Sequence, residues 1–80
     1  MTIDQFLSPS HPEFGQARWV QFSNPVQGGF IICSLSLNWT DGQGYDRSIS
    51  STRGAGDVEA AFQRSLAELK EKAQKAEVEL

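Results

Sequence analysis

The run from Phe30 to Thr40, FIICSLSLNWT, restricts the fold more than any other stretch of the chain. Its odd-numbered positions are all apolar, whereas its even-numbered positions are apolar at Phe30 and Ile32 and polar from Ser34 onward. Successive side chains of a β-strand point to opposite faces of the sheet. The pattern therefore predicts a strand buried along the whole of one face and only at its start on the other. We expect this strand in the middle of a sheet.

Two more strands are predicted on either side of it. Residues 17–23 (ARWVQFS) form a first strand that places Val20 and Phe22 on one face and Trp19 on the other. Residues 45–51 form a third strand. If Val20 and Phe22 share the buried face of the central strand, Trp19 shares the face of Phe30 and Ile32.

The spacing of apolar residues changes after the third strand. From residue 57 onward they recur at intervals of three and four, which predicts a helix over residues 57–76. Such a helix is roughly 30 Å long, so we expect its last turns to project beyond the sheet or fray. The predicted fold class is α+β, a single domain over residues 1–80. A three-stranded antiparallel β-meander carries one C-terminal helix on one face, in the order β-β-β-α.

The turn after the central strand, DGQG at residues 41–44, allows two registers. A two-residue Asp-Gly loop is the common hairpin connection, but here it places apolar side chains opposite polar ones. An odd-numbered loop centred on the first glycine sets Trp39 against Tyr45 and Leu35 against Ile49. A one-residue slip moves every side chain to the other face, so apolar pairing favours the odd loop.

The segments outside these elements are an N-terminal arm and a link. In the arm, residues 1–16, a short helical turn over residues 3–7 is expected, and its large apolar side chains indicate that the arm lies against the domain. The link, TRGAG at residues 52–56, is expected to be flexible because of its glycines. The predicted core consists of Val20, Phe22, Ile31, Leu35, Leu37, Ile49, Phe62, Leu66 and Leu69.

Size and composition narrow the class of function. A chain of 80 residues buries only about 60% of its unfolded surface, which leaves no room for a deep pocket. Its net charge of −3 lacks the basic excess that is typical of nucleic-acid binding. Its single cysteine excludes an internal disulfide and fits a reducing, cytoplasmic compartment. No apolar run is long enough to span a membrane, and the N-terminus lacks the features of a signal peptide.

The candidate functional residues lie on the sheet face away from the helix. Trp19, Phe30 and Ile32 form an apolar patch there, rimmed by small polar side chains and by Asp46, which is typical of a protein-binding surface. The alternative is that the N-terminal arm covers this patch with Phe6, Leu7 and Phe14.

The remaining candidate groups favour ordinary structural roles. The loop before the helix resembles an anion site, but Asp57 and Glu59 follow its glycines and would repel phosphate. His11 has no second ligand with metal-binding spacing, and Cys33 is expected to be a buried, inert thiol. No carboxylates are paired for acid–base work. We therefore expect no enzyme activity, no metal and no cofactor.

Two resemblances suggest functions. The order of elements over Trp19–Leu69, with residues 3–7 as a first helix, is similar to that of double-stranded-RNA-binding domains. That resemblance implies phosphate contacts from lysines at the start of the last helix, where this chain has Asp57, Val58 and Glu59. Direct nucleic-acid binding is therefore not expected. As an alternative it would use Arg18, Arg47 and Arg53.

The second resemblance is to small phage-encoded inhibitors, anti-CRISPR proteins among them. It is carried by GGFIICSLSLNWTDGQGYDRS followed by DVEAAFQRSLAEL, in a short, acidic chain with one cysteine. The resemblance implies a stoichiometric binder of a host protein or nucleoprotein complex, acting in the bacterial cytoplasm. We expect a non-enzymatic protein-binding module of this kind that uses Trp19, Phe30, Ile32 and Asp46. A homodimer or self-associating structural subunit that uses the same patch is a further alternative.

Overall fold

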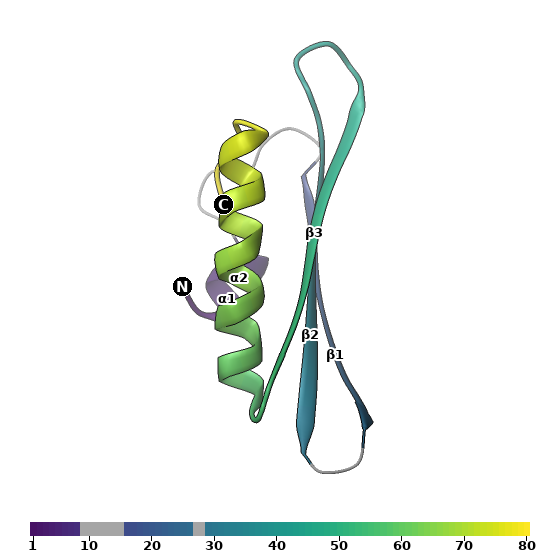
Figure 1. Cartoon of the computed structure of the whole chain (residues 1–80). Helices are drawn as coiled ribbons and strands as arrows, with labels where there is room; N and C mark the ends of the chain where they lie inside the picture. The colour runs from purple at the N-terminus through teal and green to yellow at the C-terminus, as the bar shows by residue number, and fades with distance from the viewer. Residues whose placement is uncertain (9–15, 27–28) are drawn as a thin grey trace.

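The chain forms one antiparallel sheet with both helices on the same side of it (Figure 1). The computed structural model describes residues 1–8, 16–26 and 29–80. The elements in chain order are α1 (Ile3–Leu7), β1 (Ala17–Val26), β2 (Phe30–Thr40), β3 (Asp46–Ala55) and α2 (Val58–Lys75). The strand order β1-β2-β3 makes β2 the central strand. The predicted α+β class, the β-β-β-α order and the N-terminal helical turn are confirmed.

The central strand has the bounds and the buried face that its alternation predicts. Cys33, Leu35 and Leu37 are fully buried and Trp39 nearly so, all on the face under α2. In β1, Val20 lies opposite Leu35. Directly opposed residues share a face, so Trp19, which lies opposite Ser36, is on the uncovered face as predicted.

The β2–β3 hairpin has an odd loop, but its register is two residues away from the prediction. Leu37, not Leu35, lies opposite Ile49, and Trp39 lies opposite Arg47. The loop is longer than predicted because residues 41–45 are closed by a backbone hydrogen bond of their own. The Asp41 backbone N–H donates to the Tyr45 carbonyl at 2.9 Å, which leaves residues 41–45 outside the two strands. An even-numbered shift leaves every side chain on its predicted face.

β3 is longer than predicted, and the prediction of a flexible link over residues 52–56 is wrong. The strand continues to Ala55, which lies opposite Ile31 and is only 4% exposed. Gly54 sits within the strand because the Phe30 ring lies over it, and a Cβ added at Gly54 would collide with that ring. Glycine in a strand often marks such a close approach.

Asp57 caps the N-terminus of helix α2. The Asp57 side chain accepts a hydrogen bond from the Ala60 N–H at 2.7 Å, satisfying a donor of the first turn. The predicted apolar stripe is buried from Phe62 to Ala73, but its first member, Val58, is 43% exposed. None of the described helices is long and apolar enough to cross a membrane.

The end of α2 neither projects nor frays. After Ala76 the chain takes a positive φ at Glu77, and the Val78 N–H donates to the Ala73 carbonyl at 3.0 Å, a Schellman motif. The chain then turns back, so that Val78 packs with Trp39 and Ala73. Figure 1 shows that the β2–β3 hairpin, not the helix, is the element that extends furthest at this end.

Helix α1 completes the core from the same side as α2. Phe6 is fully buried and meets the Phe62 ring edge-on, with centroids 6.3 Å apart. Arg18 donates to the Phe6 carbonyl at 3.0 Å and lies over its ring. Phe22, expected in the core, is instead 37% exposed, because α2 packs on β3 and β2 and leaves that end of β1 uncovered.

Candidate functional site

No described residue outside the sheet covers the sheet face opposite the helices. The alternative in which the N-terminal arm covers it fails for Phe6, which is buried on the helix side. Leu7 is 44% exposed, and Phe14 lies outside the described residues. Trp19 is 52% exposed and Phe30 is 46% exposed. Both aromatic side chains therefore present exposed surface on this face.

The four predicted site residues are spread along this face. Trp19 and Asp46 line one shallow hollow of about 370 Å³. Phe30 and Ile32 lie toward the other end, near the β1–β2 connection. Ile32 is four residues along β2 from Ser36, the residue opposite Trp19, which corresponds to roughly 13 Å. Asp46 lies opposite Thr40, four residues from Ser36 in the other direction, so Trp19 lies between Asp46 and the Phe30–Ile32 pair on an elongated surface.

Small hydroxyl side chains occupy the positions between these residues. Ser34 and Thr52 lie opposite each other on β2 and β3 and share a hydrogen bond of 3.2 Å. The neighbouring positions on this face are Gln21, Ser23, Ser36, Ser48 and Ser50. Hydroxyl groups donate and accept equally well. The face therefore offers an aromatic anchor at Trp19 and apolar contacts at Phe30 and Ile32, with neutral side chains that donate and accept hydrogen bonds around them.

The loop at residues 41–45 fixes the end of this face that carries Asp46. One Asp41 carboxylate oxygen accepts from the N–H groups of Gln43 and Tyr45, and the other lies 3.0 Å from Arg47 Nε. These interactions, the Tyr45 N–H first among them, lower the pKa of Asp41 below its ordinary value. Asp46 itself is exposed and accepts a hydrogen bond from Thr40.

The lowered pKa of Asp41 predicts a pH-dependent contribution to stability. A carboxylate favoured in the folded state stabilises it above the unfolded pKa, and this contribution is lost as pH falls through the folded pKa. We expect Asp41→Ala to lower the thermal midpoint at neutral pH. The difference from the parent should shrink on acidification and vanish below the folded pKa, in thermal melts monitored by circular dichroism. A difference independent of pH would contradict the assignment.

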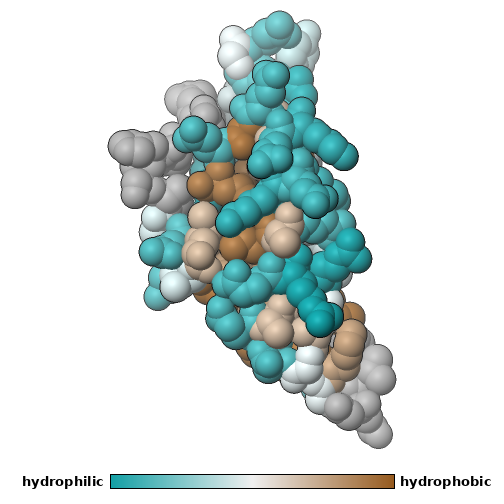
Figure 2. All heavy atoms as spheres, turned by 60° about the vertical axis from the view of Figure 1, so that its left-hand side comes forward, coloured by the Kyte–Doolittle hydropathy of each residue, from teal (hydrophilic) through white to brown (hydrophobic). Residues whose placement is uncertain are grey.

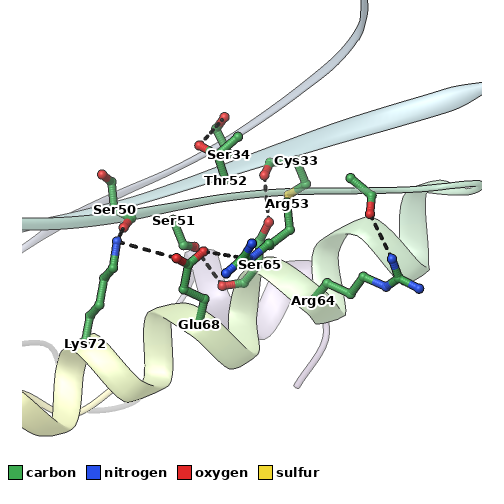
Figure 3. Close-up of polar contacts among 11 residues, drawn as sticks. Cys33, Ser34, Ser50, Ser51, Thr52, Arg53, Arg64, Ser65, Glu68 and Lys72 are labelled. Carbon is green, nitrogen blue, oxygen red and sulfur yellow. Dashed lines mark hydrogen bonds and ion pairs between the residues drawn. The ribbon is translucent and has the colours of Figure 1, made fainter. Parts of the chain in front are cut away.

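The helix side of the sheet is held by polar contacts that the sequence did not reveal (Figure 3). Ser65 is fully buried and donates to the Cys33 carbonyl at 2.7 Å, and Ser51 donates to the Ser65 carbonyl at 2.7 Å. These two hydrogen bonds connect α2 to β2 and β3. The Cys33 thiol is buried as predicted, and desolvation raises its pKa, which disfavours the reactive thiolate.

A groove of about 550 Å³ between β3 and α2 gathers four of the chain's seven basic side chains. They are Arg53, Arg64, Lys72 and Lys75. Their charges are offset within the groove, because Glu68 lies 3.1 Å from Arg53 and 3.8 Å from Lys72. The helix-bearing side, which Figure 2 brings forward, is mostly hydrophilic around a hydrophobic strip.

The three arginines proposed for nucleic-acid binding are not brought together. Arg18 is bonded to Phe6, Arg47 to Asp41 in the hairpin, and Arg53 to Glu68 beside α2. Among the described residues, no group of His, Cys, Asp and Glu side chains is placed to hold a metal ion, and His11 lies outside them. Comparison of the chain with protein-family models, curated proteins and solved structures found no match.

Proposed function

We propose that this protein is a non-enzymatic binding module that docks on a protein partner through the uncovered face of its sheet. The observation that carries the proposal is Trp19, a large side chain held 52% exposed on a regular strand. Tryptophan is the residue most enriched among interface hot spots. Because the strand positions it, little conformational entropy is lost when it enters a partner's pocket.

The chemistry of the face indicates the kind of surface that it fits. The charged residues that line the Trp19 hollow are Asp46 and Arg47, of opposite sign, so charge steering is weak and shape and apolar burial dominate. We propose a partner surface with an apolar pocket for Trp19, a second apolar contact for Phe30 and Ile32, and polar groups between them. A basic group beside the Trp19 pocket would pair with Asp46.

The resemblance to phage-encoded inhibitors suggests which partner to test first. The proposal is stoichiometric inhibition of a bacterial defence complex, such as a CRISPR effector, in the host cytoplasm. The scattered and engaged positions of Arg18, Arg47 and Arg53 favour a protein surface of that complex over its nucleic acid. Tight gel-shift binding of RNA that weakens steeply with salt would favour the nucleic-acid alternative instead.

The test is the effect of Trp19→Ala on binding to a purified effector complex. We expect affinity to fall at least tenfold, equivalent to about 1.4 kcal/mol, because the main anchor is lost. The thermal midpoint should stay close to that of the parent, since the side chain is half exposed. Biolayer interferometry and a target-cleavage assay, titrated to one equivalent, measure the two effects.

Val58→Ala is the matched control for this substitution. Val58 is 43% exposed but lies at the start of α2, away from the uncovered face. It should leave affinity unchanged. If Trp19→Ala lowered the thermal midpoint strongly and left affinity intact, Trp19 would be a structural residue and the proposed docking face would be wrong.

A further inference from the structure

The two edges of the sheet differ in how their backbone groups are used. At the outer edge of β3, Lys72 Nζ donates to the Ser50 carbonyl at 2.6 Å and Arg64 Nη1 donates to the Gly54 carbonyl at 3.2 Å. Side chains from α2 therefore occupy two of the outward carbonyls that another strand would need (Figure 3). Basic side chains at a sheet edge are a common protection against unwanted pairing.

The hydrogen bonds of the β2–β3 hairpin determine which residues of each strand direct their backbone N–H and C=O groups toward the neighbouring strand and which direct them away from it. The Asp41 N–H bonds the Tyr45 carbonyl, so the odd-numbered pairs of β2 and β3 exchange hydrogen bonds and the even-numbered pairs do not. The carbonyls of Ser50 and Gly54 accept hydrogen bonds from α2 and so point away from β2, as this alternation requires. Even-numbered residues of β2 consequently direct their backbone groups toward β1. Through the β1–β2 register, Trp19 and Gln21 direct their backbone groups toward β2, and the even-numbered residues of β1 direct theirs away from it.

At the outer edge of β1, no described side chain occupies the outward backbone groups of residues 18–22. The outward backbone groups belong to Arg18, Val20 and Phe22, and no described strand pairs with them. From Trp19 to Val26 the strand carries no charged side chain. Phe22 is 37% exposed on the helix side of this edge, and Trp19 is 52% exposed on the other side. An edge with unused outward backbone groups and exposed aromatic residues is a site for strand addition, here over residues 18–22, before the bulge between Ser23 and Val26.

We infer that the occupant is a second copy of the chain, paired antiparallel through β1 about a two-fold axis at Gln21. In this register Val20 lies opposite Phe22 of the second copy, and the reverse, so two apolar pairs form on the helix side. Trp19 meets Ser23 on the other side, and Arg18 meets Asn24. Moving the axis to Val20 would set Arg18 opposite Phe22, which apolar pairing disfavours.

The dimer is a continuous six-stranded sheet with all its helices on one side. A two-fold axis perpendicular to an antiparallel pair keeps equivalent faces together, so both uncovered faces form one surface. The inference goes beyond the proposed function and does not depend on it, because pairing is measured without any partner. If both hold, the dimer presents two copies of the docking face side by side.

Single-cysteine cross-linking tests the axis. Gln21 would oppose its own copy in a non-hydrogen-bonded pair, with Cα atoms about 4.5 Å apart, within the range that a disulfide spans. Gln21→Cys should therefore form a disulfide-linked dimer under mild oxidation. Ser23→Cys is the matched control, since it lies on the same face of the same strand but its copies would be roughly 13 Å apart. The native Cys33 is buried in both variants.

Sedimentation velocity over a micromolar concentration series tests the backbone pairing itself. The parent should sediment as a dimer at the upper concentrations. Phe22→Pro removes an outward N–H that the monomer does not use, so it should abolish the dimer and retain the native circular dichroism spectrum. Phe22→Ala, which keeps that N–H, should retain a weaker dimer. A monomeric parent overturns the inference, as does a dimer in which Gln21→Cys cross-links no better than Ser23→Cys.

Discussion

Replacing Phe6 by alanine is expected to lower the free energy of unfolding by about 3 kcal/mol or more. The side chain is fully buried although it belongs to a helix of only five residues. Its ring packs edge-on against Phe62 and lies under the guanidinium of Arg18. The substitution removes these contacts together and opens a cavity in the core, beside the face of α2 that packs on the sheet.

Urea and thermal unfolding measure this loss, and Leu7→Ala is the control. Leu7 is the next residue of the same helix but is 44% exposed, so its truncation should change stability by only about 0.5 kcal/mol. For a domain of this size, the loss at Phe6 corresponds to a thermal midpoint roughly 12–24 °C lower. Equal small effects of both substitutions would mean that α1 is not part of the folded core.

The burial of Phe6 marks the limit of what local pattern could predict. The central strand, its buried face and the helix stripe follow from alternation at two and recurrence at three and four, because each pattern repeats over many residues. The arm has no repeating pattern. Its apolar residues predict that it lies against the domain, but not on which side of the sheet. The side of the sheet on which the arm lies depends on the space beside Phe62, which only the tertiary structure determines.

β3 and the register of its hairpin also combine features that a local pattern predicts with features that tertiary contacts determine. The parity of the loop follows from apolar pairing, whereas its length depends on the hydrogen bonds that Asp41 makes to Gln43 and Tyr45. The two glycines near the end of β3 locally favour a flexible link. The strand continues there because Ala55 is buried against the core and Phe30 covers Gly54. Both contacts come from residues distant in the sequence.

The candidate face was predictable as a set of side chains but not as a shape. Alternation placed Trp19, Phe30 and Ile32 on one face, and the register confirms that placement. The spacing of these residues and Asp46 along the sheet depends on the registers of the strands. The buried roles of Ser51 and Ser65 could not be foreseen, because serine in a helix or strand is ordinarily exposed.

A charge placed at Val78 is expected to release the segment that follows α2 and to lower the free energy of unfolding by about 2–3 kcal/mol. Val78 is 8% exposed and covers Trp39 together with Ala73. A carboxylate in Val78→Asp cannot stay in that apolar contact without a large desolvation cost. The segment therefore detaches, and the loss is limited to the burial that it contributed.

Trp39 reports this detachment directly if Trp19 is first replaced by phenylalanine. In that background the parent should emit at short wavelength, because Trp39 is only 7% exposed. Val78→Asp should shift the emission to the red in the folded protein and increase quenching by acrylamide, before any denaturant is added. Glu79→Ala, at the exposed neighbouring position, should change neither quantity. An unshifted emission in Val78→Asp with parent-like stability would mean that the end of α2 frays and that the Schellman turn contributes nothing to the fold.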